Sequence, residues 1–458
     1  MSNSDLPDHH PEIVRRTVAA VLPTKLKSAL GQFMTPLSVA RFMAAMFPDS
    51  TLQTCRLLDA GAGVGALSCA FLDRWAAANG GFCFQKVELT AYEIDATLRG
   101  HLQGTLSRYA ERLRILPHIS GADFIEAGAI EGLQGRLRFT HAILNPPYKK
   151  INSASQHRLI LRRAGIETVN LYSAFVALSL ALMEPGGQLV AIIPRSFCNG
   201  PYYRAFREFL FSKAAIRHIH LFASRNKAFR DDQVLQENVI IRLEREGEPG
   251  PVTISNSIDD SFSDLTTHEH PFERIVFPGD SEKFIHVPAS PEHTAVELSP
   301  LIRSSLAEIG VQVSTGPVVD FRLKNYIRQR PQPGDAPLLY PGHFTGREAQ
   351  WPKEGMKRGN AIALNDETKK WLYPNGFYTV VRRFSAKEER RRIVASVVRP
   401  DSFPSAIMLG FENHLNVFHE QRKSLPEALA YGLAAFLSTT AVDDQFRRFN
   451  GHTQVICA

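Results

Sequence analysis

Residues 56–76 read RLLDAGAGVGALSCAFLDRWA, and this stretch decides the fold. An apolar run ending near Asp59 predicts a buried strand, and the segment after the glycines has a helical pattern. Between them, Gly61, Gly63 and Gly65 form a turn in which the backbone can approach a ligand without a Cβ in the way. The N-terminus of the following helix adds a positive dipole to that turn. Taken alone the motif is a weak signal, because many glycine turns bind nothing.

Four further strand patterns follow, separated by helical patterns. They are VELTAYEID at 87–95, RILPHIS at 114–120, FTHAILNPPY at 139–148 and QLVAIIP at 188–194. Alternating strands and helices predict a parallel sheet with helices on both faces. Ligands bind such sheets at the carboxyl ends of the strands. Polar residues stand at those ends in this chain, namely Asp59, Glu93, Asp123 and Asn145. The sequence therefore predicts an α/β fold with a binding site along one edge of its sheet.

The acidic residues at two of these strand ends suit the parts of an adenosine group. Glu93 can accept hydrogen bonds from both hydroxyls of a ribose. Asp123 can accept a hydrogen bond from an exocyclic amine, and the neighbouring ring of Phe124 can pack on the face of a nucleobase. Together with the glycine turn, these residues describe a pocket for an adenosine-containing cofactor.

The sharpest motif in the chain is Asn145-Pro146-Pro147-Tyr148 at the end of the fourth strand. Two prolines remove two backbone donors and stiffen the turn. The side-chain oxygen of Asn145 and the carbonyl oxygen of Pro146 can then face outward as two acceptors. Two acceptors directed at one point suit a planar NH2 group, and holding both of its hydrogens frees the nitrogen lone pair for attack. Tyr148 offers a stacking face for the ring that carries the amine.

These motifs in this order resemble those of S-adenosylmethionine-dependent N6-adenine DNA methyltransferases. They are GQFMTP at 31–36, DAGAGVG at 59–65, YEID at 92–95, ADF at 122–124 and NPPY at 145–148. The arrangement is that of the gamma class from restriction–modification systems, similar to the TaqI-like methyltransferase domain. The resemblance covers at least residues 30–245. It implies an α/β, Rossmann-like catalytic domain followed by a C-terminal α+β target-recognition region.

The resemblance also implies S-adenosyl-L-methionine as the cofactor and gives each motif a role. Glu93 would hold the ribose and Asp123 the adenine amine, while Ile94 and Phe124 would pack on the adenine ring. The residues expected to bind the cofactor are Thr35, Pro36, Asp59, Gly61, Gly63, Glu93, Ile94, Asp123 and Phe124.

The resemblance further implies that Asn145, Pro146 and Tyr148 hold the target adenine. Phe229, in the segment KAFRDD, matches the aromatic residue that stacks on the other face of that base; a core phenylalanine is the alternative interpretation. A duplex hides the adenine amine, so the nucleotide has to be flipped out of the helix. Direct attack of the amine on the sulfonium methyl needs neither a cysteine nucleophile nor a metal ion.

Charge favours a polyanionic partner. The formal net charge is +7, and residues 149–230 hold 13 basic residues against 3 acidic ones. Such an excess of positively charged residues in one segment is typical of nucleic-acid binding, although a basic surface that contacts only solvent has the same composition. With the resemblance, we expect double-stranded DNA as the partner. The residues expected to contact its phosphates are Lys149, Lys150, Arg158, Arg162, Arg163 and Arg195.

Composition predicts three segments. The methyltransferase domain is expected over residues 1–245, and a linker or crossing segment rich in Gly, Pro, Ser and Asp over 246–289. A target-recognition domain is expected over 290–458, including a hairpin with a charged tip over 380–398. Members of the family commonly continue beyond the point at which this chain stops, so we expect a truncated final recognition element.

Two other functions stay open at this stage. The same rigid turn suits an amine of RNA or a glutamine amide of a protein, and a catalytically inactive nucleic-acid-binding relative would keep the basic surface. A restriction endonuclease acting on the same site is expected as a further partner, and a monomer is favoured.

A cytoplasmic location is expected. The longest apolar stretch, Leu171 to Met183, has 13 residues, whereas a membrane span needs about 20. The N-terminal segment lacks a signal-peptide pattern. We therefore expect no membrane association.

Overall fold

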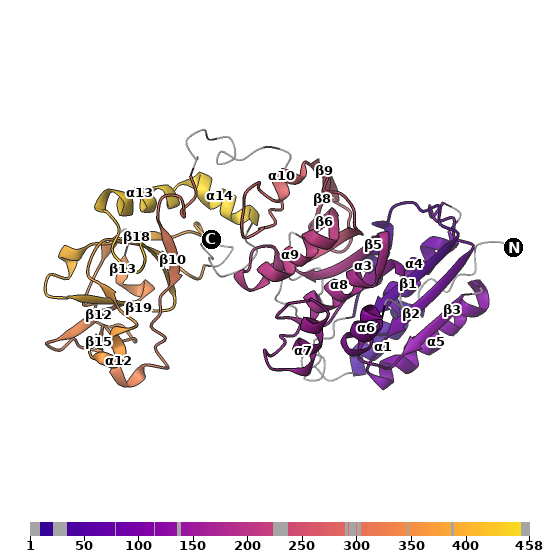
Figure 1. The fold of residues 1–458 in the computed structure, drawn as a ribbon, viewed down its shortest axis with the longest axis horizontal. Helices are drawn as coiled ribbons and strands as arrows, with labels where there is room; N and C mark the ends of the chain where they lie inside the picture. The colour runs from indigo at the N-terminus through magenta and orange to yellow at the C-terminus, as the bar shows by residue number, and fades with distance from the viewer. Residues whose placement is uncertain are drawn as a thin grey trace. The chain divides into compact units, whose positions relative to one another are not determined.

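The chain divides into two compact units. The computed structural model describes residues 10–21, 34–77, 79–113, 115–134, 139–222, 237–288, 292, 299, 304–345, 348–385 and 389–449. One unit comprises Met1–Pro291 and the other Glu292–Ala458. The division lies next to residue 290, where the target-recognition domain was expected to begin. Figure 1 shows the first unit in indigo to salmon and the second in orange to yellow.

A nine-stranded sheet forms the centre of the first unit. Its strand order is β3-β2-β1-β4-β5-β7-β6-β8-β9. The first five strands in this order are parallel, and β7 runs antiparallel between β5 and β6. Bounds are β1 Thr54–Ala60, β2 Lys86–Tyr92, β3 Leu116–Ser120, β4 Phe139–Leu144, β5 Met183–Pro194, β6 Ala214–Phe222, β7 Asn238–Arg245, β8 Val252–Ser257 and β9 Thr266–His270. The predicted α/β fold with a parallel sheet is confirmed.

Helices cover both faces of this sheet, as the strand–helix alternation predicts. One face packs against α3 (Leu37–Ala45), α4 (Ala66–Ala76) and α5 (Ala96–Leu113). The other packs against α6 (Phe124–Leu133), α8 (Leu171–Ala181) and α9 (Arg204–Lys213). Two further helices are α1 (His10–Val21), which contacts α4 and α5, and α7 (Gln156–Arg163), which contacts α6. Apolar surface removed from water on both faces is the main source of stability for such a layered fold.

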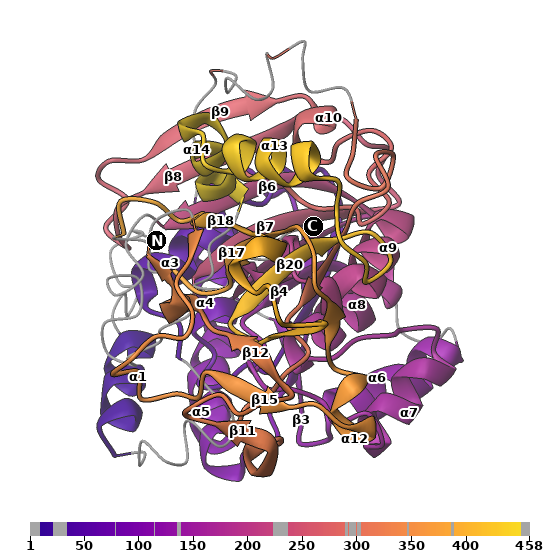
Figure 2. The same cartoon turned by 90° about the vertical axis from the view of Figure 1, so that its left-hand side faces the viewer.

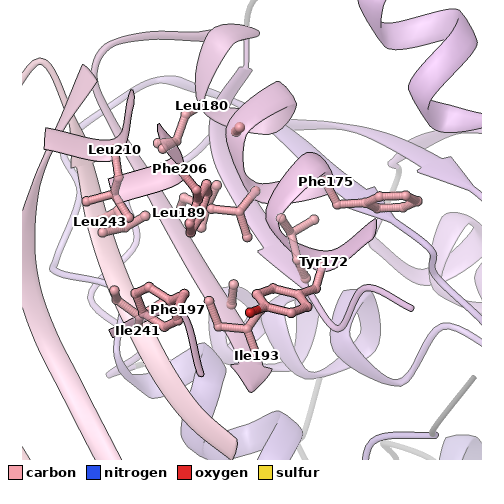
Figure 3. Packing of buried hydrophobic residues seen from close by; sticks show 14 of the residues in the cluster. Tyr172, Phe175, Leu180, Leu189, Ile193, Phe197, Phe206, Leu210, Ile241 and Leu243 are labelled. Carbon is pink, nitrogen blue, oxygen red and sulfur yellow. The ribbon is translucent and has the colours of Figure 1, made fainter. Parts of the chain in front are cut away.

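The apolar stretch from Leu171 onward forms a buried helix. In α8 every residue from Tyr172 to Leu180 is buried. Figure 3 shows buried residues on the α8 side of the sheet, which form one cluster that includes Leu180 of α8 and Leu189 of β5. Among the residues that the structure describes, no helix has the length and apolar character that crossing a membrane requires.

Residues 246–289 differ from the expected linker. β8 and β9 lie within the same sheet as β6, and the whole segment belongs to the first unit. Its polar residues are accommodated because they contact a histidine of β6: Ser255 Oγ lies 2.9 Å from His220 Nδ1, and Ser257 Oγ lies 3.2 Å from His220 Nε2. The composition suggested a linker, but these hydroxyl groups have partners supplied by a strand distant in sequence.

The second unit contains two sheets. The larger has the order β10-β20-β17-β18-β14-β13 and the smaller β11-β15-β12-β19-β16, drawn in orange in Figure 2. Bounds are β10 Gln312–Thr315, β11 Ile327–Arg328, β12 Asp335–Leu339, β13 Phe344–Thr345, β14 Glu348–Ala349, β15 Ala361–Ala363, β16 Tyr373–Pro374, β17 Tyr378–Arg382, β18 Ala395–Val398, β19 Met408–Phe411 and β20 Leu415–His419.

Helix α13 (Glu427–Leu437) packs against β17 and β18, and α14 (Thr440–Phe449) follows it. Strands β17 and β18 pair antiparallel, so the predicted hairpin is confirmed. The part of its tip at 386–388 lies outside the described residues.

The place of β8 in the sheet can be tested by removing a buried side chain. Ile254 of β8 is fully buried, and Ile254→Ala leaves a cavity in the core of the first unit. We expect the free energy of unfolding to fall by about 2–5 kcal/mol, measured by urea denaturation with far-UV circular dichroism. Ile258→Ala is the matched control, because that side chain is 49% exposed. Equal, small effects of the two variants would contradict a core position for β8.

Candidate functional site

The glycine turn between β1 and α4 needs glycine for steric reasons. Gly63 and Gly65 have φ angles of 57° and 91°, in the left-handed region that side chains disfavour. A Cβ on Gly65 would also lie 2.9 Å from Leu102 Cδ1. The turn is held against the end of β2, because the backbone N–H of Gly61 donates to Tyr92 O at 2.9 Å. The turn therefore lies beside the end of β2 with its backbone close to the residues that follow Tyr92.

Glu93, the first residue after β2, is buried and bonded to this turn. Its Oε2 accepts a hydrogen bond from Gly63 N at 2.8 Å, and its Oε1 accepts one from Asp95 N at 2.9 Å. Burial raises the pKa of Glu93, and these backbone donors act in the opposite direction. A carboxylate has about four acceptor positions, so both oxygens keep capacity for a ligand hydroxyl.

Asp59, near the end of β1, is fully buried. Ser68 Oγ donates to its Oδ2 at 2.6 Å, whereas Oδ1 has no hydrogen-bond partner among the described residues. Burial raises the pKa of Asp59 to about 7, with a smaller contribution from the negative charge of Glu93. A buried acceptor without a partner is costly, and such an atom suits a ligand that brings a donor.

Asp123 stands at the N-terminus of α6. Its Oδ1 accepts hydrogen bonds from the backbone N–H groups of Ile125 at 2.8 Å and Glu126 at 3.2 Å, and its Oδ2 lies 3.1 Å from His157 Nε2. The adjacent Phe124 packs in a cluster of rings, with its centroid 5.0 Å from that of Phe175. The acid is thus held in place beside an aromatic wall.

The Asn145 turn follows β4 and carries a network of polar contacts. Asn145 Nδ2 donates to Thr35 Oγ1 at 2.9 Å, and the Tyr148 hydroxyl lies 3.1 Å from both Asn145 Oδ1 and Ile192 O. The ring of Tyr148 packs edge-on against Tyr172, with centroids 6.2 Å apart. Burial raises the pKa of Tyr148 well above its ordinary value, so the hydroxyl stays protonated and can donate.

A pocket of about 230 Å³ is lined by most of the site residues described above. It lies where the strand order reverses between β1 and β4, the position at which such sheets bind ligands. Of the residues expected to bind a cofactor, those that line it are Thr35, Gly61, Gly63, Glu93, Ile94, Asp123 and Phe124. Asn145 lines it as well.

Two of the residues expected to bind the cofactor are not among those that line the pocket. Asp59 is fully buried within β1, and Pro36 occupies the N-cap of α3. Pro146 and Tyr148 lie outside the pocket lining, next to Asn145.

Sequence reasoning missed several pocket residues. Pro147 lies within the Asn145-Pro146-Pro147-Tyr148 motif, and Phe175 lies within the apolar stretch Leu171 to Met183, so the neighbourhood of both was available from the sequence. His157 has no motif of its own, and only the packing of α7 against α6 brings it to Asp123.

The basic residues divide into two groups. Lys149, Lys150, Arg162 and Arg163 are exposed, as phosphate contacts would require. Arg158 and Arg195 are buried, contrary to that expectation: Arg195 Nη1 donates to Glu237 Oε1 at 2.9 Å, and Arg158 is bonded to Glu167. A buried guanidinium paired with a carboxylate is engaged within the protein and is not available to a phosphate. Phe229 lies outside the described residues.

The buried state of Asp59 predicts a pH dependence of stability. An unfolded aspartate titrates near pH 4, so the native chain holds the proton more tightly. The stability from this group is complete below about pH 4 and is lost as the pH rises through about 7. Between pH 4 and pH 7 the free energy of unfolding should fall in both chains. In Asp59→Asn this fall should be smaller than in the unaltered chain by roughly 2–4 kcal/mol.

Urea denaturation at a series of pH values measures this difference. Asp49→Asn is the control, because the Asp49 side chain is 86% exposed. Parallel pH profiles for Asp59→Asn and the unaltered chain would show that Asp59 titrates normally.

Comparison with known proteins places this site in a family. Residues 97–229 match the family described as Eco57I restriction-modification methylase. The chain is 52% identical over 448 residues to the type II methyltransferase M.BsuBI of Bacillus subtilis, across 96% of this chain and 88% of that protein. It is 39% identical over 451 residues to the type II methyltransferase M.PstI of Providencia stuartii, with the same 96% and 88% coverage.

Among solved structures, the type IIG restriction endonuclease BpuSI is similar at 12% identity with a TM-score of 0.49, over 94% of this chain and 57% of that one. The sequence identities above decide membership, since they extend over nearly the whole chain. The chain therefore belongs to the type II DNA methyltransferases of restriction–modification systems.

Proposed function

We propose that this DNA methyltransferase transfers a methyl group from S-adenosyl-L-methionine to the N6 amine of an adenine flipped out of double-stranded DNA. One observation carries the proposal. Asn145 lines the same pocket as Glu93 and Asp123. A group that can hold an amine thus shares a cavity with two acids that can hold an adenosine.

The pocket residues fit the proposed cofactor. When bound, S-adenosyl-L-methionine supplies an electrophilic methyl group on a sulfonium. Glu93 would accept hydrogen bonds from the ribose hydroxyls, and Asp123 would accept one from the adenine amine. Ile94, which is 58% exposed at the pocket wall, would pack on the adenine ring.

Asn145 would hold the target amine through its side-chain oxygen Oδ1. Thr35 takes up the amide N–H at 2.9 Å, which directs Oδ1 away from Thr35. Tyr148 donates to that oxygen but has Ile192 O at the same distance as a second acceptor. When Oδ1 accepts a hydrogen bond from the amine, the Tyr148 hydroxyl can still donate to Ile192 O.

DNA would approach the exposed basic residues beside the catalytic turn. Lys149 and Lys150 directly follow Tyr148, and Arg162 and Arg163 are exposed at the end of α7. Phosphate contacts of this kind set the register on DNA without reading its sequence. Base flipping costs a few kcal/mol, and stacking on the ring of Tyr148 would offset part of that cost. A restriction endonuclease of the same specificity is the expected counterpart of such an enzyme.

Removing the Asn145 amide tests the proposal. Asn145→Ala should abolish methyl transfer because the amine loses its acceptor, while binding of S-adenosylhomocysteine by calorimetry stays within about threefold. Transfer is measured with radiolabelled cofactor on duplex DNA, and mass spectrometry of the digested nucleosides identifies the methylated base. The exposed Asn152→Ala is the matched control. Methylation of cytosine, or full turnover by Asn145→Ala, would refute the assignment.

Thr35 should act through Asn145. Thr35→Val keeps the shape but removes the hydroxyl that holds the amide, so we expect kcat to fall about tenfold, equivalent to about 1.4 kcal/mol. Thr35→Ser keeps the hydroxyl and should retain most of kcat. Steady-state kinetics on DNA distinguish an effect on Asn145 from an effect on cofactor binding. If Thr35→Val raises only the KM for the cofactor and leaves kcat unchanged, Thr35 acts in cofactor binding alone.

A further inference from the structure

His157 is a pocket residue to which neither the motifs nor the proposed chemistry gives a role. It is the second residue of α7, and its Nε2 lies 3.1 Å from Asp123 Oδ2. The side chains of His157 and Asp123 are 32% and 25% exposed, so both are accessible from the pocket that they line. The contact joins the segment after the catalytic turn to the acid assigned to the adenine amine.

The hydrogen bonds of Asp123 leave a defined place for a ligand. Two backbone N–H groups, those of Ile125 and Glu126, occupy Oδ1. A carboxylate offers about four acceptor positions in all. His157 Nε2 lies 3.1 Å from Oδ2, so the acceptor capacity that remains for a ligand is on that same oxygen. The imidazole therefore sets the direction from which a ligand donor can reach Asp123.

The backbone that carries His157 is firmly held. Ser155 caps α7 and accepts a hydrogen bond from Arg158 N at 3.3 Å. Arg158 and Arg162 both bond to Glu167, and Leu161 of α7 is fully buried. The anchoring of α7 fixes the backbone position from which the imidazole reaches Asp123.

We propose that His157 is a positioning residue that fixes the Asp123 carboxylate to accept an exocyclic amine, so that the pocket selects cofactors with a 6-aminopurine base. This inference rests on the proposed cofactor site. An imidazole Nε2–H donor keeps Oδ2 an acceptor and prevents the carboxylate from rotating away from the pocket. A 6-oxopurine presents an oxygen at the same place, and two acceptors facing each other repel.

Calorimetry with two ligands tests the proposal. The probes are S-adenosylhomocysteine and its inosine counterpart, in which oxygen replaces the 6-amine. The unaltered chain should bind the adenosine compound at least about fiftyfold more tightly. His157→Ala should weaken binding of the adenosine compound about tenfold and leave the inosine compound nearly unchanged. His157→Gln, whose amide can donate at a similar reach, should restore most of the discrimination.

Gln156→Ala is the matched control, because that neighbour on α7 is exposed. Unchanged or tighter binding of the adenosine compound by His157→Ala would overturn the inference, since the imidazole would then be absent from the bound site or would occupy the place of the amine. The proposed function would survive that result, because the unaltered chain would still bind. Failure of the unaltered chain to bind S-adenosylhomocysteine would instead overturn the cofactor assignment and the inference with it.

Discussion

The parallel pairing of β1 with β4 is the constraint on which the rest of the site depends. Leu57 pairs with His141 and Leu58 with Ala142, so the glycine turn after β1 and the Asn145 turn after β4 emerge at the same level of the sheet. A Cβ placed on Gly61 would lie 3.9 Å from Asn145 O. The cofactor turn and the turn that holds the target amine are therefore neighbours because of one strand pairing.

Burial keeps the polar groups of this site in defined orientations. Thr35, Asn145 and Tyr148 share one hydrogen-bond network that ends on the backbone of β5 at Ile192. Each member restricts the next, since a buried donor without an acceptor costs about 1–3 kcal/mol. The amide of Asn145 is thus pre-oriented before any substrate binds, which is the kind of preorganisation on which catalysis by positioning relies.

Charge has two separate uses in the basic segment after the catalytic turn. Arg158 and Arg195 lie inside the protein, where Glu167 and Glu237 neutralise them. Lys149, Lys150 and Arg163 stay at the surface. The excess of basic residues in the sequence does not depend on which of them are buried. Composition could therefore indicate a polyanionic partner, but it could not show which side chains face that partner.

The sequence by itself determined the layered α/β fold, the glycine turn, the acids at the strand ends and the Asn145 turn, because each depends on neighbouring residues and on the period of an apolar pattern. Only the tertiary structure decided that β8 and β9 extend the sheet, that Arg158 and Arg195 are internal, and that His157 meets Asp123. Those facts depend on partners 9 to 42 positions away in the chain or on strands that pair across the sheet. Local sequence patterns do not encode which distant group will bond to a buried charge or hydroxyl.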